Sequence, residues 1–236
     1  FRQNSGTLFC QKASHHFDQL NWWLESDPVE VTAHGRLNVY GRNGAFRHAN
    51  CRACGFKDRC GFYWDITKDP WWMKLYVDCE DSDGYYRDGC VYRSGIDIYD
   101  TMTAHIRYAN GVLASYSLNA AVPYEGQFIV FNGSKGRLEV RNSHKQPWKV
   151  EHDAEIRLTK ISGATTVIPV DAEKGEHGGA DNHIRQAIFR PADKDPLRQK
   201  ASMRAGLMSS LIGIACYTSI EQQRQPVRIT DLVSWL

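Results

Sequence analysis

A segment near the start of the chain combines residue types that suit acid–base chemistry. Lys12, His15 and Asp18 follow one another at three-residue intervals, so on a helix their side chains project from one face. A carboxylate beside an imidazole fixes its tautomer and raises its basicity, as a general acid–base pair requires. The lysine, one turn earlier, could bind a substrate oxygen or supply a proton. The alternative interpretation is a helix start whose polar side chains are solvated.

The cysteines suggest a second kind of chemistry, because five of the seven lie between Cys51 and Cys90. Thiolates spaced as in Cys51, Cys54, Cys60 and Cys90 can surround one tetrahedral ion, which predicts a structural zinc site. Cys79 is the other choice of fourth ligand. An iron–sulfur cluster needs similar ligands. Disulfides in an oxidising compartment and free buried thiols are the remaining interpretations.

A third candidate is the glycine-containing loop from His177 to Asp181. Its glycines allow the backbone to approach a ligand closely, and a short helix is expected to follow over 182–189. His177 and Asp181 are therefore candidate substrate-binding residues. A plain helix start, capped by Asp181, explains the same residues equally well.

Helices and strands must hold these candidate residues in place. The periodicity of apolar residues predicts a helix near each end of the chain with strands between. Apolar residues at helical spacing indicate helices over 14–24 and 200–223. The dipeptides Asn110-Gly111 and Ser134-Lys135 mark two hairpins. The expected strands cover 29–40, 101–109, 112–120, 127–133, 136–142, 148–151, 154–160 and 165–170.

The order of these elements predicts the fold class. Because strands follow one another without βαβ alternation, we expect α+β: a large, mainly antiparallel open sheet with helices packed on one face. One domain is expected over 1–236, carrying an irregular insertion at 41–100 that is rich in Gly, Asp, Arg, Cys and aromatic residues. An irregular segment of that length is usually functional or cross-linked locally.

Composition and missing motifs exclude several function classes. Lys plus Arg number 29 and Asp plus Glu 27, a net charge of +2, which gives no support to a nucleic-acid partner or an anionic membrane surface. No apolar run approaches the roughly 20 residues that span a bilayer. The glycine-rich dinucleotide fingerprint is absent, so no Rossmann domain is expected in this chain. Localisation stays open, because reduced cysteines would suit the cytoplasm and disulfides the periplasm.

Several segments, in order, resemble the C-terminal domain of the Gfo/Idh/MocA oxidoreductases, in the branch with a CxxC insertion. They are SGTLFCQKASHHFDQLNWWL, YYRDGCVYRSGIDIYD, FNGSKGRLEV and HGGAD. The resemblance covers nearly the whole chain. It implies a two-domain enzyme that uses NAD or NADP and acts on sugars, inositols or related polyols. A Rossmann domain, missing here, would precede this chain, and the sheet would build a homo-oligomer.

The resemblance also implies roles for individual residues. His15 matches the acid–base histidine of the family's D-x3-H-x2-D pattern, and Asp18 matches the trailing aspartate that would orient it. Gln11 stands where the leading aspartate is expected. A glutamine cannot relay a proton, so Lys12 would compensate. Gln11 and His16 are then candidate ligands for substrate hydroxyls.

Two other functions fit the same residues. Some relatives use the nicotinamide for a transient oxidation that permits glycosidic cleavage, and the loop at His177 is similar to theirs, which makes a redox-assisted glycosidase one alternative. A non-catalytic carbohydrate-binding or assembly module is the other. In every case the chain by itself is expected to lack hydride-transfer activity, because the cofactor domain is missing.

Overall fold

The chain forms two compact units, which are described separately below. The first joins Phe1–Ala121 to the segment from Ala201 onward, and the second is Val122–Lys200. The structure is a computed structural model that describes residues 1–144, 146–171, 173–190 and 195–233.

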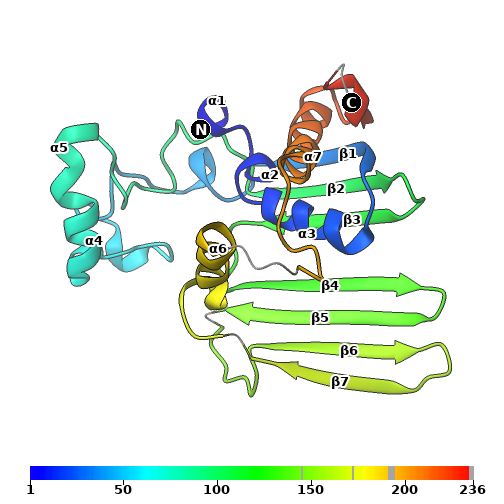
Figure 1. The fold of residues 1–236 in the computed structure, drawn as a ribbon. Helices are drawn as coiled ribbons and strands as arrows, with labels where there is room; N and C mark the ends of the chain where they lie inside the picture. The colour runs from blue at the N-terminus through cyan, green and yellow to red at the C-terminus, as the bar shows by residue number, and fades with distance from the viewer. Residues whose placement is uncertain (145, 172, 191–194, 234–236) are drawn as a thin grey trace. The chain divides into compact units, whose positions relative to one another are not determined.

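The first unit contains a four-stranded antiparallel sheet with the strand order β3-β2-β1-β8 (Figure 1). Every second residue of β2, from Met102 to Tyr108, is buried, whereas the residues between them are exposed or half-buried. This period of two shows that one face of the sheet lies on the core. The strands are β1 (Pro28–Arg36), β2 (Thr101–Tyr108), β3 (Leu113–Asn119) and β8 (Val227–Arg228).

Helices cover the buried face of this sheet. Phe9 and Phe17 from the N-terminal helices meet Leu211 and Ile212 of α7 in one apolar cluster with the strand residues. None of the helices that the structure describes is long and apolar enough to cross a membrane. The helices of this layer are α1 (Arg2–Ser5), α2 (Leu8–Gln11), α3 (Ser14–Leu24) and α7 (Met203–Glu221).

A glycine allows α7 to approach α2 closely. A Cβ placed on Gly213 would lie 2.7 Å from the backbone oxygen of Phe9 and 2.9 Å from Cα of Cys10. Contacts this short are repulsive for any side chain, so the absence of a side chain at Gly213 sets the spacing of the two helices. That spacing determines where the residues after α2 lie.

The first strand is shorter than the sequence predicts, because the side chain of Asp100 binds the backbone that would continue it. Its buried carboxylate accepts hydrogen bonds from the backbone N–H groups of Asn38, Val39 and Tyr40 at 2.7–2.9 Å. These donors are therefore unavailable to a strand ladder, and β1 ends at Arg36.

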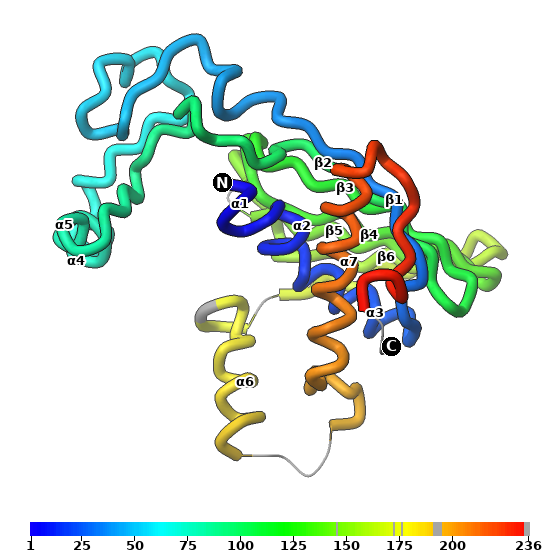
Figure 2. The backbone as a smooth tube through the Cα atoms, turned by 90° about the horizontal axis from the view of Figure 1, so that it is seen from above, coloured from blue at the N-terminus to red at the C-terminus, as the bar shows by residue number. Residues whose placement is uncertain are grey.

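The insertion leaves the sheet after β1 and returns to it at β2 (Figure 2). Buried Asp88 accepts from the backbone N–H and Nε of Arg52, both at 3.0 Å, and Arg52 also pairs with Glu80. This ion cluster ties the two ends of the insertion together. Its described elements are η1 (Gly41–Asn43), η2 (Lys57–Arg59), η3 (Ile66–Lys68), α4 (Pro70–Leu75), η4 (Val77–Cys79) and α5 (Glu80–Asp83).

The second unit holds another antiparallel sheet, with the order β4-β5-β6-β7. The expected turn at Ser134-Lys135 joins β4 to β5. The α+β class and the antiparallel strands are thus confirmed, with the strands divided between two sheets. The elements are β4 (Glu125–Gly133), β5 (Gly136–His144), β6 (Ala154–Lys160), β7 (Thr165–Val170), η5 (Glu176–Gly179) and α6 (Ala180–Phe189).

The strand expected over 148–151 is wrong. That segment has no ladder partner, and the ring of Trp148 meets Tyr124 edge-on at 4.8 Å between centroids. The next strand, β6, begins only at Ala154.

Candidate functional site

The acid–base segment lies on the first turn of α3 and the link before it. Ala13 and Phe17 are both fully buried. Because these two residues fix the inner side of the turn, Gln11, Lys12 and His15 are exposed to solvent. The packing of the core thus presents a lysine and an imidazole together on one exposed turn.

His16 has a partner on the sheet. Its Nδ1 lies 2.7 Å from the phenol oxygen of Tyr116 on β3. Burial lowers the pKa of His16, and the charge of neighbouring His15 lowers it further. Burial also raises the pKa of the Tyr116 phenol, as does the nearby thiol of Cys216. Both groups are therefore held in their neutral forms near pH 7.

This pair is compatible with a neutral His16 that carries its hydrogen on Nε2. A protonated phenol can donate its hydrogen to Nδ1, which leaves the hydrogen of a neutral imidazole on Nε2. Tyr116 is itself held in place by the rings of Phe9 and Phe17, at 6.0 and 5.1 Å between centroids. The orientation of His16 is thus fixed by the core.

The expected interaction between His15 and Asp18 is not supported by a contact of this kind. Among the described residues, no hydrogen bond or ion pair joins the His15 imidazole to the Asp18 carboxylate, although both lie on α3. The orienting role of Asp18 therefore stays a prediction.

His177 and Asp181 are brought together in the second unit. Nδ1 of His177 lies 2.8 Å from a carboxylate oxygen of Asp181, at the start of α6. His177 has a φ of 50°, and Gly178 and Gly179 also have left-handed backbones. A left-handed conformation is uncommon outside glycine, and such positions cluster at ligand sites. The segment containing Lys12 and His15 belongs to the other unit.

The predicted zinc site is not supported. Within the ranges that the structure describes, no three His, Cys, Asp or Glu side chains gather where they could hold a metal ion. The sulfurs of Cys54 and Cys90 instead accept from backbone N–H groups two residues later, each at 3.4 Å.

All seven cysteines are free thiols in this structure. The insertion is held by other means, namely the ion cluster at Arg52 and Asp88 and a series of ring contacts. Trp72 stacks on Tyr76 at 5.4 Å, and the guanidinium of Arg87 lies 5.3 Å from each of these rings. Reasoning from cysteine spacing alone missed this packing.

Sequence reasoning also missed Tyr116. The alternation in the strand that follows Asn110-Gly111 places Tyr116 among the inward-facing residues, and a buried phenol usually finds a hydrogen-bond partner. That signal indicates a polar contact under the sheet. The identity of the partner depends on where α3 packs, which the sequence pattern does not provide.

Comparison with known proteins gives the family. Residues 1–229 match the family model for the oxidoreductase family, C-terminal alpha/beta domain. The chain is 32% identical over 250 residues to YteT of Bacillus subtilis (strain 168), whose assigned description is oxidoreductase, covering 98% of this chain and 58% of YteT.

Solved structures share the fold. A Sinorhizobium meliloti 1021 protein, assigned as a myo-inositol dehydrogenase, is 19% identical with a TM-score of 0.50, over 95% of this chain and 50% of that one. An Agrobacterium radiobacter oxidoreductase, in complex with NAD+, L-tartaric acid and magnesium, is 12% identical with a TM-score of 0.52, over 94% and 49%. The chain thus spans about half the length of the relatives it matches. It belongs to the Gfo/Idh/MocA oxidoreductase family and contains the C-terminal alpha/beta domain of that family.

Proposed function

We propose that this chain forms the substrate side of an oxidoreductase that uses NAD or NADP and acts on a sugar, inositol or related polyol. The observation that carries the proposal is the exposed turn of α3, where Lys12 and His15 accompany an oriented His16. Family membership supports the reaction class. The assigned descriptions of the relatives, an inositol dehydrogenase and a complex with NAD+, support the substrate class and the cofactor.

The cofactor would be held mainly by a domain outside this chain. The strands of both described sheets are antiparallel, whereas a dinucleotide cradle needs a glycine turn between a parallel strand and a helix. The nicotinamide, when bound, accepts or returns a hydride. This chain's own residues would bind the polyol and move its hydroxyl proton.

The roles follow from exposure and hydrogen bonding. His15 would take the proton of the reacting hydroxyl as the C–H bond releases its hydride, and would return that proton in the reverse direction. Lys12, Gln11 and His16 would bind neighbouring hydroxyl oxygens. Adjacent hydroxyls are the feature that distinguishes a polyol from a simple alcohol, and several donors on one turn match it.

Steady-state kinetics of the full-length enzyme tests these roles. His15→Gln should lower kcat by about 100-fold or more, as loss of a general base does, while Lys12→Met should mainly raise KM. Gln19→Ala, on the exposed side of the same helix, is the matched control and should leave both constants unchanged. Wild-type kcat in the His15 variant would exclude His15 as the proton-transfer residue.

A redox-assisted glycosidase remains the second candidate, because His177 and Asp181 form a hydrogen-bonded pair. Product analysis separates the two activities. A dehydrogenase produces reduced nicotinamide in step with oxidised polyol, whereas a redox-assisted glycosidase releases free sugar without net reduction. A full-length protein that binds carbohydrate but shows neither reaction would instead be a binding module.

We also propose that the sheet of the second unit joins copies of the chain. Ladder partners Ile129, Val140, Ile156 and Ile168 place an apolar row on one of its faces, and the side chain of Ile168 is 47% exposed. A second copy offers the same apolar surface, and self-complementary surfaces of this kind build symmetric dimers. Light scattering should show a smaller particle for Ile168→Lys and no change for Val167→Lys on the opposite face.

A further inference from the structure

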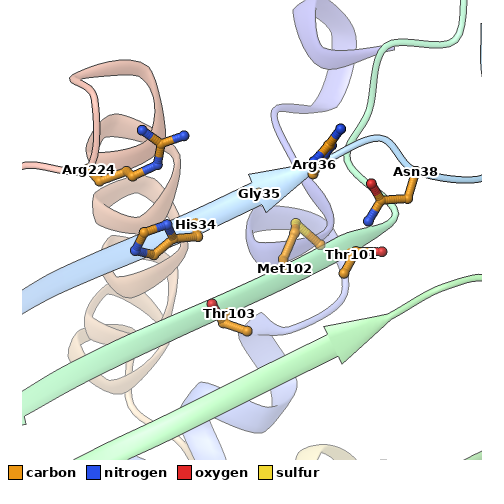
Figure 3. Close-up of a pocket in the computed structure, with 8 residues that line it drawn as sticks. All are labelled: His34, Gly35, Arg36, Asn38, Thr101, Met102, Thr103 and Arg224. Carbon is orange, nitrogen blue, oxygen red and sulfur yellow. The ribbon is translucent and has the colours of Figure 1, made fainter.

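A pocket of about 290 Å³ lies on the first unit, where three segments of the chain meet (Figure 3). His34, Gly35 and Arg36 come from β1, and residues 101–103 come from β2. Arg224 reaches it from the turn after α7. None of these residues has a part in the proposed proton transfer.

The charged side chains that line the pocket are basic. Arg36 and Arg224 line it, and no carboxylate is among its lining residues. Within the described ranges neither guanidinium forms an ion pair, whereas Arg204 is paired with Asp27 at 2.8 Å. Two fixed positive charges without a counter-charge mark a place where an anion would be stabilised.

The nearby carboxylate of Asp100 does not neutralise this charge. It is buried, and it accepts from three backbone N–H groups and from the hydroxyl of Thr101. Burial by itself would raise the pKa of Asp100, but these hydrogen bonds lower it. The Asp100 carboxylate is thus occupied by hydrogen bonds at the end of β1, and it does not line the pocket.

The turn that carries Arg224 is held in an unusual conformation. Gln223 and Arg224 both have left-handed backbones, with φ of 58° and 71°. The turn is fixed by Ser219, whose backbone oxygen accepts from the N–H of Arg224 at 2.7 Å and whose hydroxyl donates to the backbone oxygen of Gln225 at 2.7 Å. Consecutive strained residues, rigidly supported, are typical of sites that position a side chain for a ligand.

The edge of β1 adds a backbone donor. β8 pairs only with Glu30 and Val31, so the rest of this edge has no strand beside it in the described part of the chain. The N–H of Ala33 is satisfied there by the hydroxyl of Ser219 at 3.0 Å. Because alternate residues of an antiparallel strand point their N–H groups to the same side, the N–H of Gly35 also faces this edge.

We propose that this pocket binds a phosphate group, either as the free ion or as the ester of a small molecule. A phosphate carries close to two negative charges at pH 7, which matches Arg36 and Arg224 better than a single carboxylate does. Thr103 supplies a hydroxyl donor and His34 an imidazole N–H. The volume is at the lower limit for small-molecule pockets, so one phosphate group fits and a dinucleotide does not.

Isothermal titration of the whole chain with inorganic phosphate, at pH 7 and low salt, tests the proposal. Arg36→Gln and Arg224→Gln should each weaken binding by about tenfold or more, as loss of a charge-assisted hydrogen bond does. Arg228→Gln is the matched control, because Arg228 is exposed on β8 and lies outside the pocket. The proposal is overturned if phosphate does not bind, or if Arg228→Gln weakens binding as much as the pocket variants.

Two further ligands distinguish the source of the phosphate. Glucose 6-phosphate binding at least as tightly as phosphate would support an ester, and weaker binding would support the free ion. Gluconate has a similar carbon chain but a carboxylate. Gluconate binding as tightly as glucose 6-phosphate would contradict selection for phosphate. The outcome is independent of the proton-transfer proposal, since the two share no residue.

Discussion

The phenol of Tyr116 lies 2.7 Å from Nδ1 of His16 and connects the inner face of β3 to the exposed turn of α3. Tyr108 on β2 is almost fully buried, but its phenol oxygen has no hydrogen-bond partner in the described part of the chain. The two tyrosines therefore differ in whether the phenol hydroxyl has a hydrogen-bond partner. That difference decides how much stability the protein loses when the hydroxyl is removed.

Tyr116→Phe should destabilise the protein by about 1 kcal/mol, since it removes a net hydrogen bond. Tyr108→Phe should be neutral or stabilising, because it removes a buried oxygen that pairs with nothing described. Urea denaturation measures both free energies of unfolding. A loss of stability in Tyr108→Phe as large as that in Tyr116→Phe would show that the Tyr108 hydroxyl has a partner.

Protonation of His16 should oppose folding. Burial lowers its pKa in the folded state, so the unfolded chain takes up the proton first as the pH falls. The contribution of His16 to the free energy of unfolding is therefore complete above its ordinary pKa of about 6.5. That contribution is lost as the pH falls below this value. Unfolding free energies at pH 7 and pH 5 should differ less in His16→Gln than in the wild type. An NMR titration of the folded protein that places the His16 pKa above about 6.5 would contradict the sign.

Two glycines of α7 should respond in opposite directions to alanine. Gly213→Ala forces a methyl against the backbone of Phe9 and should cost about 1–3 kcal/mol, as overpacking does. Gly206 has open space where its Cβ would lie, so Gly206→Ala should stabilise by about 0.5–1 kcal/mol through helix propensity. Thermal unfolding of the two variants tests whether the approach of α7 to α2 depends on Gly213.

Asp88 should hold the insertion together. Asp88→Asn weakens the bidentate contact with Arg52 and should cost about 2–3 kcal/mol of local stability, the range for hydrogen bonds to charged groups. The expected result is faster hydrogen exchange and proteolysis within residues 41–100. Asp81→Asn is the control, because Asp81 is exposed on the neighbouring α5. If hydrogen exchange within residues 41–100 is unchanged in Asp88→Asn, the aromatic contacts alone are enough to hold the insertion together.

The sequence by itself determined the elements whose signals are local. The helix over 14–24, the turn at Asn110-Gly111 and the antiparallel strands follow from apolar spacing and turn chemistry, which act between residues close in the chain. The residues that resemble the family, above all the segment containing Lys12 and His15, were visible for the same reason. The family comparison confirms the family that they indicated.

Only the tertiary structure decided which residues meet across long separations. His16 and Tyr116 are 100 residues apart, and Ala33 and Ser219 are 186 apart, so no local pattern couples them. The cysteine spacing predicted a metal site, yet the described side chains form no group of three ligands that could hold a metal ion, because spacing fixes only which ligands could reach an ion and not where the loops turn. That Arg36 and Arg224 line one pocket likewise depends on how α7 packs on β1, and that packing is set by the whole core.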